Sequence, residues 1–125
     1  TPRPDLKKLE AEGIDLLLDI DTQGAKKVIK AIDRPILIYL LPPSLKVLRE
    51  RLMNRGVDSL EMIKYRLSNA RRDMEEARGY HYVIVNHKIE EATETLKSII
   101  LAERCRRAKD LILKENKRAW EEKDG

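Results

Sequence analysis

Apolar residues along the chain form three short runs that are separated by stretches with helical periodicity. The runs are of strand length and lie at residues 14–20, 36–41 and 80–86. Between them, apolar side chains recur every three or four residues, which places them on one face of a helix. Near-continuous apolar strands that alternate with amphipathic helices are typical of a parallel sheet covered on both faces. The pattern therefore predicts an α/β fold with three parallel strands.

Five helical segments are predicted around these runs from their start and stop signals. Asp5 and Ser44 are suited to cap helix N-termini, and Gly56 is suited to end a helix. Asp58 with Glu61 three residues later resembles the start of a further helix. The helices are expected at residues 5–12, 22–32, 44–55, about 58–78 and 89 to about 120.

The composition fits a single domain, or part of one, with an aliphatic core. Hydrophobic residues make up 42% of the 125 residues, but aromatics only 4%, with no Phe. The lone Cys105 excludes an internal disulfide and is expected to be inert within a helix. No apolar run approaches the roughly 20 residues needed to cross a membrane, and nothing resembles a signal peptide. We therefore expect a cytoplasmic protein, and the abrupt start at Thr1 suggests a truncated chain.

Two aspartates lie at the end of the first apolar run, in the segment LLLDIDTQGA at residues 16–25. Asp19 and Asp21 would lie at the carboxyl end of a parallel strand, where such sheets bind ligands, and Asn86 would lie at the same end of the third strand. An apolar strand that ends in Asp is the pattern by which P-loop proteins hold Mg²⁺ beside nucleotide phosphates. Such an Asp can equally cap the following helix, and this stretch alone leaves both interpretations open.

The helical hairpin expected at about residues 44–78 is rich in arginine. Between Arg49 and Arg78 there are seven arginines and one lysine against six acids, a net charge of +2. The planar guanidinium matches two phosphate oxygens at once, and Arg51 and Arg55 lie one helical turn apart. With Arg66 on the second helix, they could clamp phosphates as a lid. The alternative is a solvated hairpin in which Arg and Glu pair along each helix.

The order of these motifs resembles the guanylate kinases, which are P-loop enzymes that transfer the γ-phosphate of ATP to GMP. The resemblance covers residues 1–104 and is carried by LLLDIDTQGAKKV, LLPPSLKVLRERLMNRGVDS, IKYRLSNARRDM and YVIVNHKIEEATETLKSIILAER. It implies that residues 1–125 are the C-terminal part of one guanylate kinase-like domain. The implied fold is a partial P-loop NTPase-type parallel sheet of three strands, with flanking helices, a helical lid at about 44–78 and a C-terminal helix at about 89–120.

The resemblance also implies roles for residues on the metal and acceptor side of the site. Asp19 matches the residue that holds Mg²⁺ by way of a bound water molecule. Asp21 lies on the GMP side, where this segment helps to hold the guanine. Thr1 matches the last residue of a guanine-binding Tyr-Gly-Ser/Thr motif, although the Tyr and Gly are absent here.

On the lid and donor side, Arg55 and Arg66 match lid arginines that close on the phosphates and would neutralise charge on the transferring group, and Arg55 would also bind ATP. Arg51 is a plausible helper of these two, and Asn86 matches a residue near the adenine of ATP. The expected ligands are therefore ATP with Mg²⁺, and GMP, with neither a nucleic acid nor a membrane as partner.

The sequence also departs from the family pattern. None of its five glycines begins the G-x-x-x-x-G-K-[ST] loop that cradles ATP phosphates. The usual YDYV and VNDD motifs read YHYV and VNHK, and His81 and His87 are interpreted as ordinary surface or edge residues. We therefore expect the 125-residue chain by itself to be inactive and only marginally stable.

Two other classes of function compete with the kinase. Guanylate-kinase-like scaffold domains bind phosphopeptides without catalysis, and the presence of Asp19, Arg55 and Arg66 favours the enzyme. A nucleic-acid binder could use the basic C-terminal tail, although it has no interleaved aromatics and no known motif. The tail is better explained as a solvated helix end; its cations are Arg104, Arg106, Arg107, Lys109, Lys114, Lys117 and Arg118.

Overall fold

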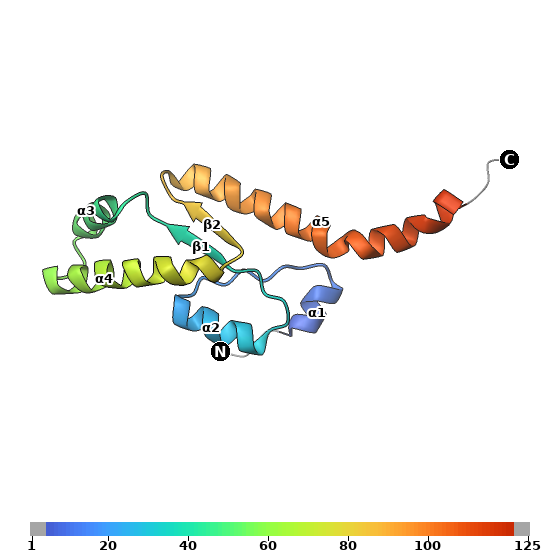
Figure 1. Ribbon diagram of the computed structural model, residues 1–125, viewed down its shortest axis with the longest axis horizontal. Helices are drawn as coiled ribbons and strands as arrows, with labels where there is room; N and C mark the ends of the chain where they lie inside the picture. The colour runs from blue at the N-terminus through green and yellow to red at the C-terminus, as the bar shows by residue number, and fades with distance from the viewer. Residues whose placement is uncertain (1–4, 122–125) are drawn as a thin grey trace. The chain divides into compact units, whose positions relative to one another are not determined.

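The computed structural model describes residues 5–121, and the chain divides between Ile36 and Leu37 into two units. The first unit contains helices α1 (Leu6–Ala11) and α2 (Thr22–Ala31) (Figure 1). As predicted, the Asp5 carboxylate caps α1, because it accepts a hydrogen bond from the backbone N–H of Lys8 at 3.2 Å. The helical pattern of the sequence was therefore sufficient to locate both helices.

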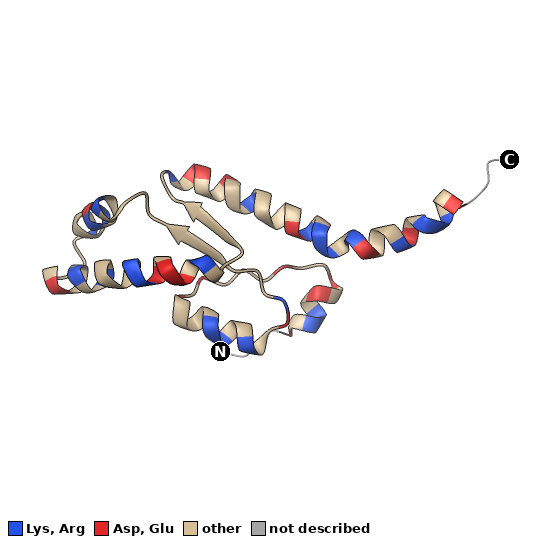
Figure 2. Cartoon of the chain, viewed as in Figure 1, with Lys and Arg blue, Asp and Glu red and all other residues tan. Residues whose placement is uncertain are grey.

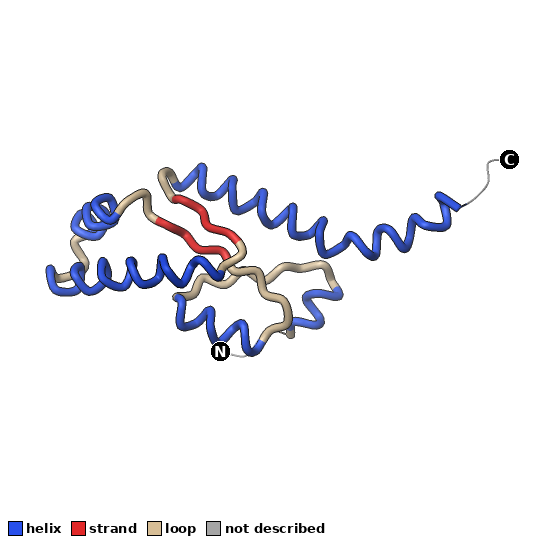
Figure 3. The backbone as a smooth tube through the Cα atoms, in the orientation of Figure 1, coloured by secondary structure: helices blue, strands red, loops and turns tan. Residues whose placement is uncertain are grey.

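The apolar run at residues 14–20 forms no strand, and Figure 3 draws it as a loop. The prediction of a first strand here is wrong for this structure. The leucines and isoleucines of the run are 41–66% exposed. A strand exists only where a neighbouring strand accepts and donates its hydrogen bonds, and an apolar pattern does not reveal whether that neighbour is present.

The second unit contains a two-stranded parallel sheet, in which β1 (Ile38–Leu41) pairs with β2 (Tyr82–Val85). The register aligns Ile38 with Tyr82 and Leu41 with Val85. Both strands were predicted from the sequence, and each predicted boundary lies within two residues of the observed one. The long helix α5 (Ile89–Glu121) follows β2 and runs alongside it (Figure 1). The α/β class is thus confirmed with two parallel strands rather than three.

Helices α3 (Leu45–Arg55) and α4 (Leu60–Glu76) form the predicted hairpin between the strands, and a short 3₁₀ turn, η1 (Ala77–Gly79), follows α4. Ser44 caps α3 by accepting a hydrogen bond from the N–H of Val47 at 3.1 Å. Gly56 ends α3 with φ of 66°, a left-handed conformation that glycine adopts without steric cost. The cap of α4 is Ser59, not Asp58 as predicted, because the Ser59 hydroxyl accepts from the N–H of Met62.

The second unit has a small aliphatic core among the described residues. Its buried hydrophobic members are Leu52, Ile63, Ala77, Ile84 and Ala92, whereas in the first unit Ala25 of α2 is buried. Leu52 and Ile63 come from α3 and α4, which contact one another, so the hairpin contributes to this core. No helix within residues 5–121 is both long enough and apolar enough to span a bilayer.

Candidate active site

Arg51 joins the α3 helix to the loop that follows β2. Its two terminal nitrogens donate hydrogen bonds to two successive backbone carbonyls, that of Asn86 at 3.0 Å and that of His87 at 3.1 Å. A guanidinium can do this because its N–H groups form a rigid fork. The structure thus brings together Arg51 and Asn86, two of the predicted site residues, which lie 35 positions apart in the sequence.

Arg66 of α4 is paired with Asp58, which lies in the loop between α3 and α4. Its Nε lies 2.9 Å from the Asp58 Oδ2 atom. The Asp58 side chain is only 10% exposed, whereas that of Arg66 is 49% exposed. The guanidinium therefore reaches from a buried anchor toward solvent. The sequence pattern predicts Asp58 at the start of a helix and gives no indication of this pair.

Arg55 is the last residue of α3, and it is exposed. At about 100° per residue along a helix, Arg55 and Arg49 lie about 60° to either side of the buried Leu52. Arg51 lies on the same side as Arg55, as expected for residues one turn apart. The cations of α3 are therefore divided between two sides of the helix.

The α4 helix shows the same division around its buried residue Ile63. Arg66 lies about 60° to one side of it and Arg71 about 80° to the other, by the same helical geometry. Since α3 and α4 form an antiparallel hairpin, Arg55 and Arg66 share one side of it, which we call the Arg66 flank. Arg49 and Arg71 share the opposite side, which we call the groove flank. Figure 2 shows how densely Lys and Arg are placed along the two helices.

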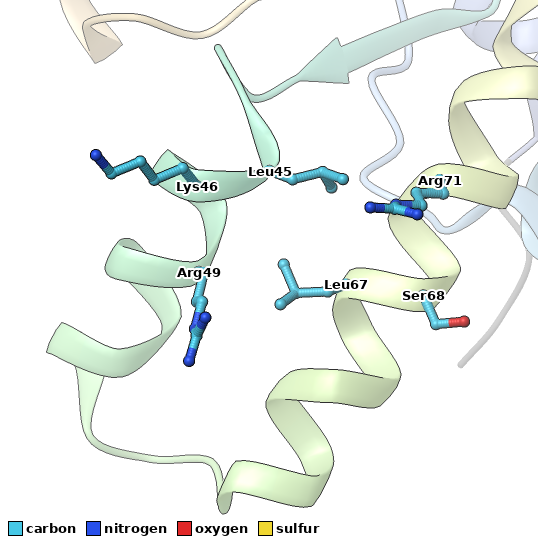
Figure 4. Close-up of a pocket in the computed structure, with 6 residues that line it drawn as sticks. All are labelled: Leu45, Lys46, Arg49, Leu67, Ser68 and Arg71. Carbon is cyan, nitrogen blue, oxygen red and sulfur yellow. The ribbon is translucent and has the colours of Figure 1, made fainter.

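The groove flank borders a shallow groove of about 450 Å³ between α3 and α4. Figure 4 shows Leu45 and Leu67 pointing into the gap, with Arg49 and Arg71 beside them on the two helices. The residues that line it are Leu45, Lys46, Arg49, Leu67, Ser68 and Arg71. The side chains of the predicted phosphate clamp, Arg51, Arg55 and Arg66, do not line this groove. Arg49 and Arg71 therefore carry the same charge as the arginines of the Arg66 flank but border a different surface of the hairpin.

Asp21 and Asp19 differ in their surroundings within the first unit. The Asp21 Oδ1 atom accepts a hydrogen bond from the N–H of Gly24 at 2.7 Å and so caps α2. The helix-cap interpretation is therefore confirmed for Asp21, which still has a second carboxylate oxygen. Asp19 is exposed, and no hydrogen bond or ion pair involves its side chain among the residues described.

A Mg²⁺ ion coordinates hard oxygen ligands and is usually held by one or two carboxylates together with water and substrate phosphates. An exposed carboxylate such as Asp19 fits the role of one such ligand. Over residues 5–121 there is no group of three or more His, Cys, Asp or Glu side chains that could bind a metal by themselves. The other predicted contact on this side of the site, Thr1, lies outside the described residues.

His81 has a structural role that the sequence analysis missed. Its Nδ1 accepts a hydrogen bond from the N–H of Leu37 at 2.9 Å, and its own N–H donates to the Leu37 carbonyl at 2.9 Å. The imidazole must therefore carry its proton on Nε2 when this bond is present. His81 is exposed and directly precedes β2, as expected of a surface or edge residue, and its two hydrogen bonds help to hold the beginnings of β1 and β2 together.

Glu103 of α5 is the center of a polar cluster between α5 and β2. It is 8% exposed, accepts a 2.6 Å hydrogen bond from the Tyr82 hydroxyl, and is paired with Arg106 at 2.6 Å. Arg106 and then Tyr82 lower the pKa of Glu103, and the hydrogen bond to Glu103 raises the pKa of Tyr82. Arg106 had been counted among the cations of the basic tail. Glu103 and Arg106 are three residues apart on α5, but no sequence signal identified Tyr82 as their partner, because it lies on β2.

Comparison with known proteins places these residues in a family. The profile of the family described as guanylate kinase matches residues 1–103. The chain is 44% identical over 106 residues to "Guanylate kinase" of Geobacter sulfurreducens, covering 85% of this chain and 52% of that protein. It is 47% identical over 100 residues to the protein of the same name from Nitrosospira multiformis, covering 80% and 48%.

A more distant relative gives the same result. The chain is 40% identical over 104 residues to "Guanylate kinase" of Rickettsia felis, covering 83% of this chain and 54% of that protein. The chain thus spans about half the length of the curated relatives it matches. Since the family profile extends over most of its residues, the chain belongs to the guanylate kinase family.

Proposed function

We propose that the gene product containing this chain is a guanylate kinase, which transfers the γ-phosphate of ATP to GMP and releases ADP and GDP in cytoplasmic purine metabolism. The observation that carries the proposal is the arginine-bearing hairpin, whose Arg51 is hydrogen-bonded to the loop at Asn86. Phosphoryl transfer is catalysed mainly by positioning the substrates and by stabilising the charge that develops on the phosphoryl group. Arginines on a hairpin that is hydrogen-bonded to the loop after β2 are suited to both tasks. The phosphopeptide-binding alternative is not favoured, because the relatives above are named as kinases.

In this proposal the Arg66 flank faces the phosphates. Arg55 and Arg66 neutralise charge that builds on the transferring phosphoryl group, and Arg55 also contacts the phosphates of ATP. Arg51 acts through the loop it holds, by fixing the backbone at Asn86, which lies near the adenine of ATP. The residues with these roles lie on the two lid helices, α3 and α4, or directly after β2.

The acceptor and metal roles fall to residues of the first unit. Asp19 would help to hold Mg²⁺, and the ion would supply positive charge beside the phosphates. One carboxylate oxygen of Asp21 accepts the hydrogen bond that caps α2. The negative charge of the carboxylate contributes to the binding of GMP. Thr1 contributes to guanine binding.

Steady-state kinetics of the complete gene product test this proposal. Arg55→Ala and Arg66→Ala are each expected to lower kcat about 100-fold, with smaller changes in KM for GMP, as for the loss of a group that acts on the transition state. Arg49→Ala and Arg71→Ala remove the same charge from the groove flank and are expected to stay within about threefold of wild type. Equal losses in all four variants would show that net charge, rather than the Arg66 flank, is responsible.

A further inference from the structure

We propose that Asp58 is a positioning residue for Arg66, which holds the guanidinium so that its terminal nitrogens face the phosphates. This inference rests on the proposed function, in which Arg66 neutralises the transferring phosphoryl group. Asp58 itself touches neither substrate nor metal in this proposal. Its task is to set the direction of the arginine before a nucleotide arrives.

The geometry of the ion pair supports this role. The contact is made at Nε, the guanidinium nitrogen nearest the helix, at 2.9 Å from Asp58 Oδ2. A carboxylate at Nε leaves the two terminal nitrogens on the far side of the group, and these carry four of the five N–H donors of arginine. Two parallel N–H groups are what bidentate phosphate recognition requires. Asp58 therefore occupies the donor that a phosphate needs least.

The burial of the two partners supports a fixed anchor rather than an ordinary surface pair. The Asp58 side chain is 10% exposed and that of Arg66 is 49% exposed. A buried carboxylate has few positions available, so the arginine that pairs with it is restricted in turn, and less rotamer freedom is lost when a ligand binds. By contrast, the Glu75–Arg78 pair, which joins the end of α4 to η1, is 65% and 81% exposed and is expected to contribute little.

The position of Asp58 also keeps it near Arg66. It directly precedes Ser59, the N-cap of α4, where the partial positive charge of a helix N-terminus favours an anion. Arg66 lies within the second turn of the same helix. Both partners therefore lie within α4 or the loop that leads directly into it, so the pair can move with the lid as a unit.

Steady-state kinetics of the complete gene product test the inference with three substitutions. Asp58→Asn keeps the size of the side chain but removes its charge, and it is expected to lower kcat about tenfold with little change in KM for ATP or GMP. Asp58→Glu restores the carboxylate and is expected to recover kcat to within about threefold of wild type. Glu75→Gln, the matched control at the exposed pair, is expected to leave kcat unchanged.

A double-substitution cycle separates positioning from a general effect on the fold. If Asp58 acts only through Arg66, then Asp58→Asn has no further effect on kcat in an Arg66→Ala background. The same tenfold loss in that background would overturn the inference. A normal kcat for Asp58→Asn alone, with Arg66→Ala impaired, would also overturn it while leaving the proposed function intact.

Nuclear magnetic resonance gives a readout that does not depend on catalysis. The Arg66 Nε–Hε signal is expected to be resolved and slow to exchange with water in the wild type, and to broaden in Asp58→Asn but not in Glu75→Gln. On titration with inorganic pyrophosphate, the terminal nitrogens of Arg66 should shift while the Nε–Hε signal stays in place. An Nε–Hε signal that is equally mobile in wild type and Asp58→Asn would refute the positioning role, even if Arg66 proved essential for catalysis.

Discussion

Replacing Arg51 should weaken the binding of ATP more than it slows the chemical step. In the structure Arg51 donates to the carbonyls of Asn86 and His87 at 3.0 and 3.1 Å, so its guanidinium is engaged with the protein backbone. Arg51 therefore fixes the position of the loop after β2. In the proposed function this loop places the side chain of Asn86 near ATP. The perturbations are Arg51→Ala, which removes both bonds, and Arg51→Lys, which keeps the charge but not the fork.

The expected size follows from the two hydrogen bonds. Bonds to a charged donor contribute about 1.5–3 kcal/mol each where they are shielded from water. Arg51 is exposed, so we discount the pair to a total of about 1–2 kcal/mol. That free energy corresponds to a factor of about 5–30 in the population of the correctly held loop. Arg51→Ala should therefore raise KM for ATP about 5- to 30-fold, with an intermediate rise for Arg51→Lys.

The assay is steady-state kinetics of the complete gene product at varied ATP and saturating GMP, together with calorimetric titration of ATP. Arg49→Ala, on the groove flank of the same helix, controls for the loss of a positive charge from α3. A kcat that falls about 100-fold while KM for ATP is unchanged would refute this reasoning. It would instead place Arg51 beside Arg55 as a group that contacts the transferring phosphate.

Three further predictions concern other parts of the chain. Asp21→Asn keeps a good helix cap and should raise KM for GMP, whereas Asp19→Asn should weaken the Mg²⁺ dependence of turnover; the reverse pattern in the two titrations would exchange their roles. The folded-state pKa of Glu103 is lowered from 4.5 by Arg106 and Tyr82, so its contribution to stability is present above pH 4.5 and is lost as pH falls through the lowered pKa. Glu103→Gln should therefore flatten the acid limb of stability in urea unfolding, and an unchanged limb would contradict the assignment. The 125-residue chain alone should form no measurable GDP and show no sharp unfolding transition by circular dichroism, and observing either would contradict the expectation.

The sequence determined the features that depend on a few neighbouring residues. The start of α3 at Ser44 and its end at Gly56 follow from local capping, since a hydroxyl and a glycine meet backbone requirements within one helical turn. The two strands of the sheet were identifiable because they are short apolar runs with turn signals on both sides. The motifs of the lid were also sufficient to suggest the family.

Tertiary structure decided the features that need a partner far away in the chain. The apolar run at residues 14–20 has the pattern of a strand, but within residues 5–121 no neighbouring strand pairs with it. The role of Arg51 is visible only because folding brings it to Asn86. In the sequence Glu103 is likewise indistinguishable from the other acidic residues of its helix. Its role is visible only in the fold, where the Tyr82 hydroxyl of β2 donates a hydrogen bond to it. The sequence determines which hydrogen-bond donors, acceptors and charges each residue has, but the fold determines which of them are paired with another residue.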